Sequence, residues 1–169
     1  RLSSSRRCEA YLRKPLIYWD SMVLISWLMN ETLPDPNDDQ GVRDVMERAE
    51  KGEIIIVTAQ DPSKKEILLN TMSPEAVRKY NSALRRRTTQ FLYYDPAVVD
   101  LTGRIREYYK QRGEKVPTSA DAEHLAYAIH YKVDEFHTFD KGKKGGADLL
   151  AMDGNVAGHS LRICKPPFK

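Results

Sequence analysis

Cysteine and long apolar runs are scarce in this chain of 169 residues. Its two cysteines, Cys8 and Cys164, show no metal-binding or redox spacing, so we expect a reduced, cytoplasmic protein. No apolar run approaches the roughly 18 residues of a membrane-spanning helix, and residues 1–14 lack the apolar core of a secretory signal. The sequence also lacks a P-loop, a glycine-rich dinucleotide turn and a serine-hydrolase elbow, which excludes several common enzyme classes.

The remaining composition is that of an ordinary globular protein, with 41% hydrophobic and 30% charged residues. The chain is long enough to bury one substantial core, and it contains no internal repeat or low-complexity segment. We therefore expect a single domain spanning residues 1–169, in which residues 1–14 form a flexible arm or an edge segment.

Short apolar runs alternate with amphipathic stretches along the chain. The runs predict strands at residues 16–20, 54–58, 91–94, 135–139 and 161–164. Helical spacing predicts helices at residues 22–29, 42–52, 74–88, 95–113 and 121–133, with another beginning at Ser63. Residues 34–39 and 141–146 have the composition of loops. Because helices separate the first two strands, the pattern predicts an α/β fold with a parallel sheet.

Four carboxylates are expected at one edge of this sheet. Asp20 ends the first strand, and Asp140 ends the strand at residues 135–139. Glu66 and Asp121 lie in the first turns of helices that follow or precede strands. The carboxyl ends of parallel strands and the amino ends of their connecting helices share one edge, so these four side chains can converge. No other set of acids in the chain is placed so consistently.

Each of these acids also has a simpler structural explanation. Asp20 can cap the helix that follows it, and Glu66 can be the second half of a capping box. Asp121 can interact with the dipole of its helix, and Asp140 can be a turn residue. These explanations account for the acids one by one, but not for their convergence.

A divalent cation would relieve the repulsion among adjacent carboxylates. Oxygen ligands favour Mg²⁺ or Mn²⁺, and one or two such ions promote attack of water on a phosphodiester. The hydroxyls of Ser21 and Thr138 neighbour Asp20 and Asp140 and are candidate hydrogen-bond partners of the carboxylates. His124, one turn after Asp121, is a supporting residue, a substrate contact or a satisfied helix histidine.

The basic residues are grouped, although the formal net charge is only +3. Grouped cations beside grouped acids suit a phosphate-bearing substrate drawn towards a metal, whereas a solvated helix face is the simpler explanation of any single group. The candidate nucleic-acid contacts are Arg85, Arg86, Arg87, Lys141, Lys143 and Lys144.

Three motifs carry a family resemblance: residues 18–21 (YWDS), 121–129 (DAEHLAYAI) and 134–140 (DEFHTFD). They resemble the PIN-domain ribonucleases, and particularly the VapC-type toxins of bacterial toxin–antitoxin pairs. The resemblance covers roughly residues 15–165 and implies a three-layer α/β/α sandwich with a mainly parallel central sheet. It also implies an Mg²⁺- or Mn²⁺-dependent RNA-cleaving site, a homodimer and inhibition by a small antitoxin protein.

In this resemblance, Asp20, Asp121 and Asp140 match the first, third and fourth acids of the family. Glu66 is chosen as the second acid. Asp61 is the alternative, because the residues that lead to Glu66 are polar where the family has an apolar helix turn. The prediction is a metal-dependent endoribonuclease, the toxin component of a type II toxin–antitoxin system. The alternatives are a non-catalytic PIN-like module that binds RNA or protein, and a phosphoacceptor or phosphatase domain with Asp20 as nucleophile.

Overall fold

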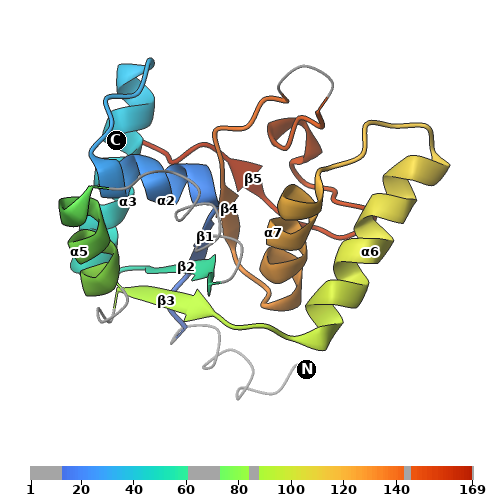
Figure 1. Cartoon of the computed structure of the whole chain (residues 1–169), viewed down its shortest axis with the longest axis horizontal. Coiled ribbons are helices and arrows are strands. Elements are labelled where there is room, and N and C mark those ends of the chain that lie inside the picture. The colour runs from blue at the N-terminus through green and yellow to red at the C-terminus, as the bar shows by residue number, and fades with distance from the viewer. Residues whose placement is uncertain (1–12, 61–72, 84–87, 143–145, 169) are drawn as a thin grey trace, which may run out of the picture.

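Five strands form one sheet at the centre of the computed structural model, which describes residues 13–60, 73–83, 88–142 and 146–168 (Figure 1). In chain order the strands are β1 (Leu16–Trp19), β2 (Ile55–Ala59), β3 (Thr89–Leu92), β4 (Glu135–His137) and β5 (Ile163–Cys164). They lie in the order β3-β2-β1-β4-β5, and every neighbouring pair is parallel. The strand β1 is therefore the central one.

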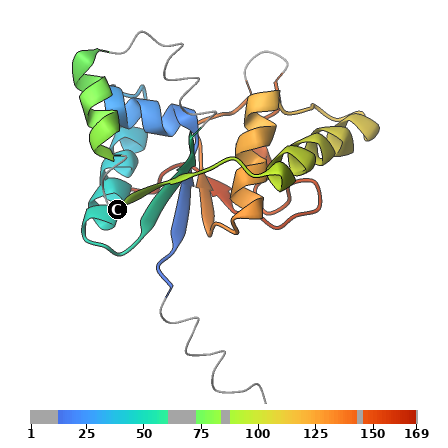
Figure 2. The ribbon, with the colours of Figure 1, turned by 60° about the horizontal axis from the view of Figure 1, so that its bottom comes forward.

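Two layers of helices cover this sheet. The helices on one face are α6 (Pro96–Gln111) and α7 (Ser119–His130); those on the other are α2 (Ser21–Met29), α3 (Pro36–Glu50) and α5 (Pro74–Ala83) (Figure 2). A short 3₁₀-helix, η1 (Leu150–Met152), lies in the connection from β4 to β5. The predicted α/β/α sandwich with a parallel sheet is confirmed.

The central strand β1 contributes to both cores. Successive side chains of a strand point to opposite faces of the sheet. Ile17 and Trp19 therefore lie in the core with α2 and α3, whereas Tyr18 lies in the core with α6 and α7. The Tyr18 ring stacks on Phe136 of β4, with the ring centroids 5.1 Å apart. Burial on both faces explains why this run of the sequence is apolar throughout.

Most predicted elements are present, with shifts at their ends. The strand β3 lies earlier than the predicted residues 91–94, because its pairing with β2 fixes its position. The strands predicted at residues 135–139 and 161–164 are shorter, since β4 and β5 pair over two residues only. The helix predicted to begin at Ser63 lies outside the described residues. Among the helices that the structure describes, none combines the length and the apolar character needed to cross a membrane.

The loop predicted at residues 34–39 is wrong in its second half, where α3 has already begun at Pro36. The preceding residue, Asp35, caps the helix by accepting a hydrogen bond from the Asn37 amide at 3.0 Å. Proline suits the first turn of a helix, because the amide it lacks would have no partner there. The sequence PDPN is therefore a helix start rather than a loop.

The fold predicts opposite effects for two glycine-to-alanine substitutions in helices. A Cβ atom on Gly41 of α3 would lie 2.1 Å from the carbonyl oxygen of Pro166, whereas a Cβ on Gly103 of α6 meets no described atom within 4 Å. Gly41→Ala should lower the free energy of unfolding by ~1–3 kcal/mol through this overlap. Gly103→Ala should raise it by ~0.5–1 kcal/mol through helix propensity. Urea denaturation measures the free energy of unfolding of both variants. A Gly41→Ala variant as stable as Gly103→Ala would contradict the packing of the C-terminal segment on α3.

Candidate active site at the carboxyl edge of the sheet

The order of the strands reverses direction at the centre of the sheet. The chain passes from β1 to β2 and β3 on one side, and later returns to β4 and β5 on the other side of β1. Open α/β sheets bind ligands at such a switch point, beyond the carboxyl ends of the two flanking strands. Asp20 follows β1 directly, and Asp140 lies shortly after the end of β4. Both therefore lie at the edge where a ligand site is expected.

Pairing between β1 and β4 brings together the chain segments that precede these two aspartates. Trp19 is opposite His137 in the parallel register, and the Asp20 amide donates to the carbonyl of His137 at 3.2 Å. After β4, the Asp140 amide donates to the hydroxyl of Thr138 at 3.0 Å. The hydroxyl of Thr138 thus orients the backbone of Asp140.

The helix α7 brings Asp121 to the same edge. It leads into β4, so it runs opposite to the strands and its first turn lies at their carboxyl ends. Asp121 is in that first turn, where the Thr118 hydroxyl donates to its Oδ2 at 2.6 Å and accepts from its amide at 3.1 Å. This reciprocal cap fixes the side chain of Asp121 against the end of the helix.

His124 connects α7 to the rest of the edge. Its Nδ1 lies 2.6 Å from the hydroxyl of Tyr18 on β1, and its Nε2 lies 2.9 Å from Oγ of Ser21, the first residue of α2. The Tyr18 hydroxyl also accepts from the Ala59 amide at 3.2 Å, so its own proton is directed to Nδ1. Nε2 then carries the ring proton and donates to Ser21. His124 is thus a buried histidine that is hydrogen-bonded at both nitrogens.

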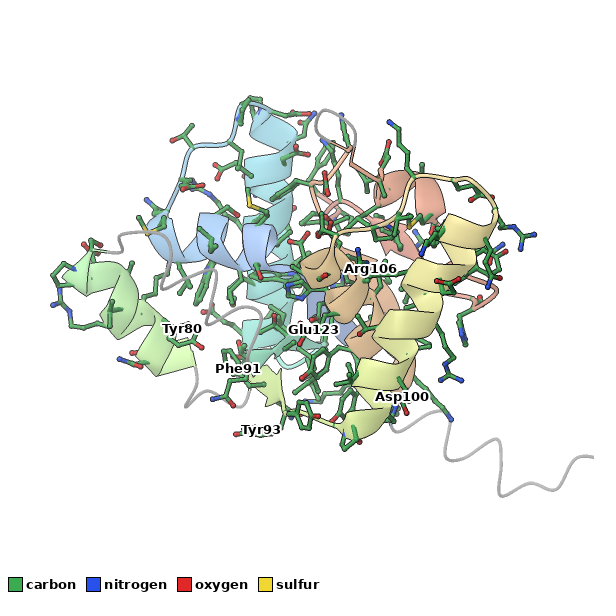
Figure 3. The ribbon with its side chains drawn as sticks, turned by 45° about the vertical axis from the view of Figure 1, so that its right-hand side comes forward. Tyr80, Phe91, Tyr93, Asp100, Arg106 and Glu123 are labelled. Atoms are coloured by element: carbon green, nitrogen blue, oxygen red, sulfur yellow. The ribbon has the colours of Figure 1, made fainter. Side chains whose placement is uncertain are left out.

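Burial sets the protonation of this hydrogen-bond chain. Desolvation lowers the pKa of His124 to about 4, so the imidazole is neutral at neutral pH. Desolvation raises the pKa of Tyr18 well above its ordinary value, and the charges of Asp20 and Glu123 add to the rise. Tyr18 therefore keeps the proton that it donates. The contribution of Glu123, seen on α7 in Figure 3, identifies a further acid near this edge that the sequence analysis did not single out.

Each of the three aspartates also has the local role that was its simpler explanation. Asp20 caps α2 by accepting from the Val23 amide at 2.9 Å, and Asp140 accepts from the Gly142 amide at 2.8 Å. Each bond described here uses one carboxylate oxygen, and a carboxylate has about four acceptor positions, so capping and metal binding are compatible. The three aspartates do not each offer a carboxylate oxygen that lies within 4.8 Å of the other two.

The comparisons with known proteins bear on the fold. The sequence matches no protein-family model and no curated protein. The FitAcB structure from Neisseria gonorrhoeae aligns at a TM-score of 0.57 and 18% identity, covering 89% of this chain and 97% of that chain. VapBC2 from Rickettsia felis, bound to a DNA fragment from its promoter, aligns at a TM-score of 0.61 and 10% identity, covering 88% of this chain and 98% of that chain. The chain has a VapC-like fold.

A third solved structure is that of VapC20 from Mycobacterium tuberculosis, a toxin that cleaves the sarcin–ricin loop. It aligns at a TM-score of 0.49 and 13% identity, covering 74% of this chain and 90% of that chain. FitAcB and VapBC2 support the predicted resemblance at the level of the fold alone.

Several predicted site residues fall outside the described part of the chain. They include Glu66 and its alternative Asp61, and the basic residues Arg85, Arg86, Arg87, Lys143 and Lys144. Of the predicted basic contacts, Lys141 is described, and it is exposed directly after Asp140. The roles of all these residues stay predictions.

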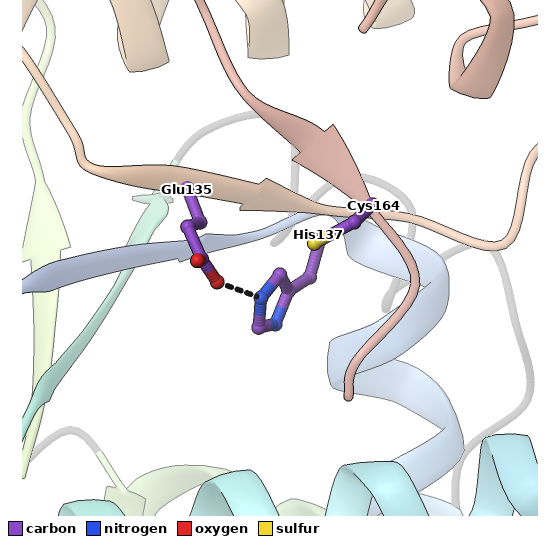
Figure 4. A group of neighbouring side chains, drawn as sticks. All are labelled: Glu135, His137 and Cys164. Atoms are coloured by element: carbon purple, nitrogen blue, oxygen red, sulfur yellow. Dashed lines mark hydrogen bonds and ion pairs between the residues drawn. The ribbon is translucent and has the colours of Figure 1, made fainter. Parts of the chain in front are cut away.

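A different group of potential metal ligands lies on β4 and β5. Glu135, His137 and Cys164 offer ligand atoms within 4.8 Å of one another, and they form the one such group among the described residues (Figure 4). Sequence analysis missed this group because Cys164 has no ligand-like spacing along the chain. The usable signal was Glu135-Phe136-His137 on a predicted strand, where alternation puts the two polar side chains on one face.

Electrostatics within this second group follow from burial and one hydrogen bond. The pKa of Glu135 is lowered chiefly by its hydrogen bond with His137, in which Nε2 lies 3.0 Å from Oε2. Burial lowers the pKa of His137 and raises the pKa of the Cys164 thiol. At neutral pH the imidazole and the thiol are therefore both uncharged in the metal-free protein.

The buried His124 predicts a specific pH dependence of stability. Its pKa is about 4 in the fold against an ordinary value of 6.5, so the unfolded chain takes up this proton first as the pH falls. The free energy of unfolding should fall by ~3 kcal/mol between about pH 6.5 and about pH 4 from this group, and His137 adds to the same trend. Urea denaturation across this window measures the loss. A His124→Gln variant should show a shallower fall, and an unchanged slope would contradict the assignment.

Proposed function

We propose that this protein is a divalent-metal-dependent endoribonuclease, the toxin component of a type II toxin–antitoxin system. One observation carries the proposal. Asp20 and Asp140 follow the two strands that flank the switch point, and the helix of Asp121 is tied to the same edge through His124. Three carboxylates at the ligand-binding edge of a VapC-like fold support metal-assisted hydrolysis of a phosphodiester.

The donor set fits Mg²⁺ or Mn²⁺. Asp20, Asp121 and Asp140 would hold the ion, with Glu66 as the proposed fourth acid, and carboxylate oxygens are the ligands that these hard cations prefer. When bound, such an ion activates water and neutralises charge on the phosphate. The protein's own contribution is orientation: Thr118 holds Asp121, and Thr138 holds the backbone of Asp140.

Cations beside this edge support an RNA substrate. Lys141 follows Asp140 directly. On α6, Arg106 donates to the carbonyl of Pro117 at 3.2 Å, which places a guanidinium next to the first turn of α7 (Figure 3). Arginine and lysine beside a metal site would hold the phosphates that flank the cleaved bond. The grouped residues Arg85, Arg86, Arg87, Lys143 and Lys144 are proposed to extend this contact.

The partners that we propose are a small antitoxin protein and a second copy of this chain. Support comes from the likeness to VapBC2 of Rickettsia felis, a complex that binds a fragment of its promoter. Tyr93, Tyr94 and Val99 are large apolar side chains that are exposed around the start of α6, and surfaces of this kind are commonly covered by protein contacts.

Substitution of the aspartates tests the proposed reaction. Asp20→Asn, Asp121→Asn and Asp140→Asn should each reduce metal-dependent RNA cleavage by about 100-fold or more, because the ion supplies several kcal/mol of transition-state stabilisation. The matched control is Asp100→Asn, an exposed aspartate on α6 whose loss should leave cleavage unchanged. Full cleavage by the three site variants would contradict the site. RNA binding without products by the wild-type protein would favour the non-catalytic PIN-like module instead.

Metal binding should also stabilise the folded protein. Because the three aspartates are distant in sequence and share one edge of the sheet only in the fold, Mg²⁺ or Mn²⁺ at a hundred times its Kd should raise the free energy of unfolding by ~2.7 kcal/mol. Thermal unfolding with and without the ion measures the shift. The shift should be lost in Asp121→Asn and kept in Asp100→Asn; a melting temperature that is insensitive to both ions would contradict the metal site.

A further inference from the structure

The group on β4 and β5 lies on the other face of the sheet from the Tyr18 core. Phe136 and Ile163 are opposite each other in the register and lie in the core with α7. Their neighbours along each strand therefore point to the opposite face, and His137 is opposite Cys164 in the same register. Figure 4 shows Glu135 and His137 on one side of β4, with Cys164 at the adjacent end of β5.

We propose that Glu135, His137 and Cys164 form a second metal site, which binds a zinc-class transition metal ion. The three ligand atoms lie within 4.8 Å of one another. A thiolate, an imidazole and a carboxylate are the ligands of Zn²⁺ and its neighbours, whereas Mg²⁺ prefers oxygen ligands alone. The donor chemistry therefore separates this site from the aspartate edge. Three protein ligands leave one tetrahedral position for water.

Burial and one hydrogen bond hold the imidazole of His137 in place beside Glu135. Its side chain is 1% exposed, and it has one described hydrogen bond, from Nε2 to Glu135. Its Nδ1 is buried and has no partner among the described residues. An ion shared with Glu135 would bind Nε2, the nitrogen that faces the carboxylate, and Nδ1 would then carry the ring proton.

The position of the site gives the ion a structural consequence. The strand β5 pairs with β4 over only two residues, so little else in the register holds it in place. An ion shared by His137 and Cys164 would join the two strands at their carboxyl ends. The carbonyl of His137 accepts the amide of Asp20, so the joined strands lie next to the aspartate edge.

Two arginines oppose a cation here, but weakly. The Nε of Arg162 lies 3.4 Å from Oε1 of Glu135, the carboxylate oxygen other than the one that faces His137. The Arg162 side chain is 68% exposed, and ion pairs of this kind contribute little because water screens them. The charge of Arg48 acts on the same group, but Arg48 itself pairs with Glu53 at 3.5 Å. Arg162 also hydrogen-bonds the Cys164 thiol, and an ion at this site would replace that bond.

Cobalt is a direct probe, because Co²⁺ bound to a thiolate absorbs in the near ultraviolet and tetrahedral Co²⁺ absorbs in the visible. Adding Co²⁺ to the reduced, metal-free full-length chain should produce both bands at one ion per chain, and Zn²⁺ should abolish them. Cys164→Ser should lose the thiolate band. Cys8→Ser is the matched control and should keep it. Glu135→Gln should weaken Co²⁺ binding by about tenfold or more.

The outcomes separate this site from the proposed nuclease. Absence of the thiolate band in the wild-type protein would overturn the proposal, as would a band that survives in Cys164→Ser and is lost in Cys8→Ser. Far-ultraviolet circular dichroism checks the fold of each variant. If Cys164→Ser unfolds, the affinity of Glu135→Gln for Co²⁺ tests the proposal instead, and unchanged affinity would overturn it. Asp121→Asn should keep the cobalt spectrum while it loses RNA cleavage, so either proposal can fail without the other.

Discussion

The hydrogen-bond chain through His124 is the interaction on which the geometry of the carboxyl edge depends. It runs from the Ala59 amide through Tyr18 and His124 to Ser21, and so joins β2, β1, α7 and α2. All four residues are buried, and an unpaired polar atom there would cost ~1–3 kcal/mol. A fully satisfied network specifies one arrangement of its elements. The helix start that bears Asp121 is therefore positioned by the protein core.

The aspartates at this edge combine an observed structural role with the metal-binding role that we propose. Asp20 caps α2, Asp121 shares a reciprocal cap with Thr118, and Asp140 closes a turn at Gly142. The local and functional explanations of each acid are not exclusive, because capping occupies only part of a carboxylate. The same bonds also preorganise the side chains, since a capped carboxylate loses little further freedom when it binds an ion.

The sequence was sufficient for the fold where local patterns decide the structure. Alternation and apolar runs predicted the strands. Because Asp20 and Asp140 follow two of these strands, the sequence also predicted that both lie at the carboxyl edge of the sheet. The sequence was insufficient where contacts between elements that are distant along the chain determine the structure. The bonds of His124 depend on how α7 packs against β1, and Cys164 meets His137 only because β5 is parallel to β4. The start of α3 was missed although its signal, Asp35 before Pro36, is local.

The brevity of the two outer strands has a consequence for assembly. At one border of the sheet β3 has four residues, and at the other β5 has two. Unpaired backbone groups on an outer strand are the template by which sheets join across molecules, and short strands offer few of them. Two copies of this chain would thus gain little from continuing one sheet into the other. The short outer strands thus disfavour strand exchange and fibrous growth.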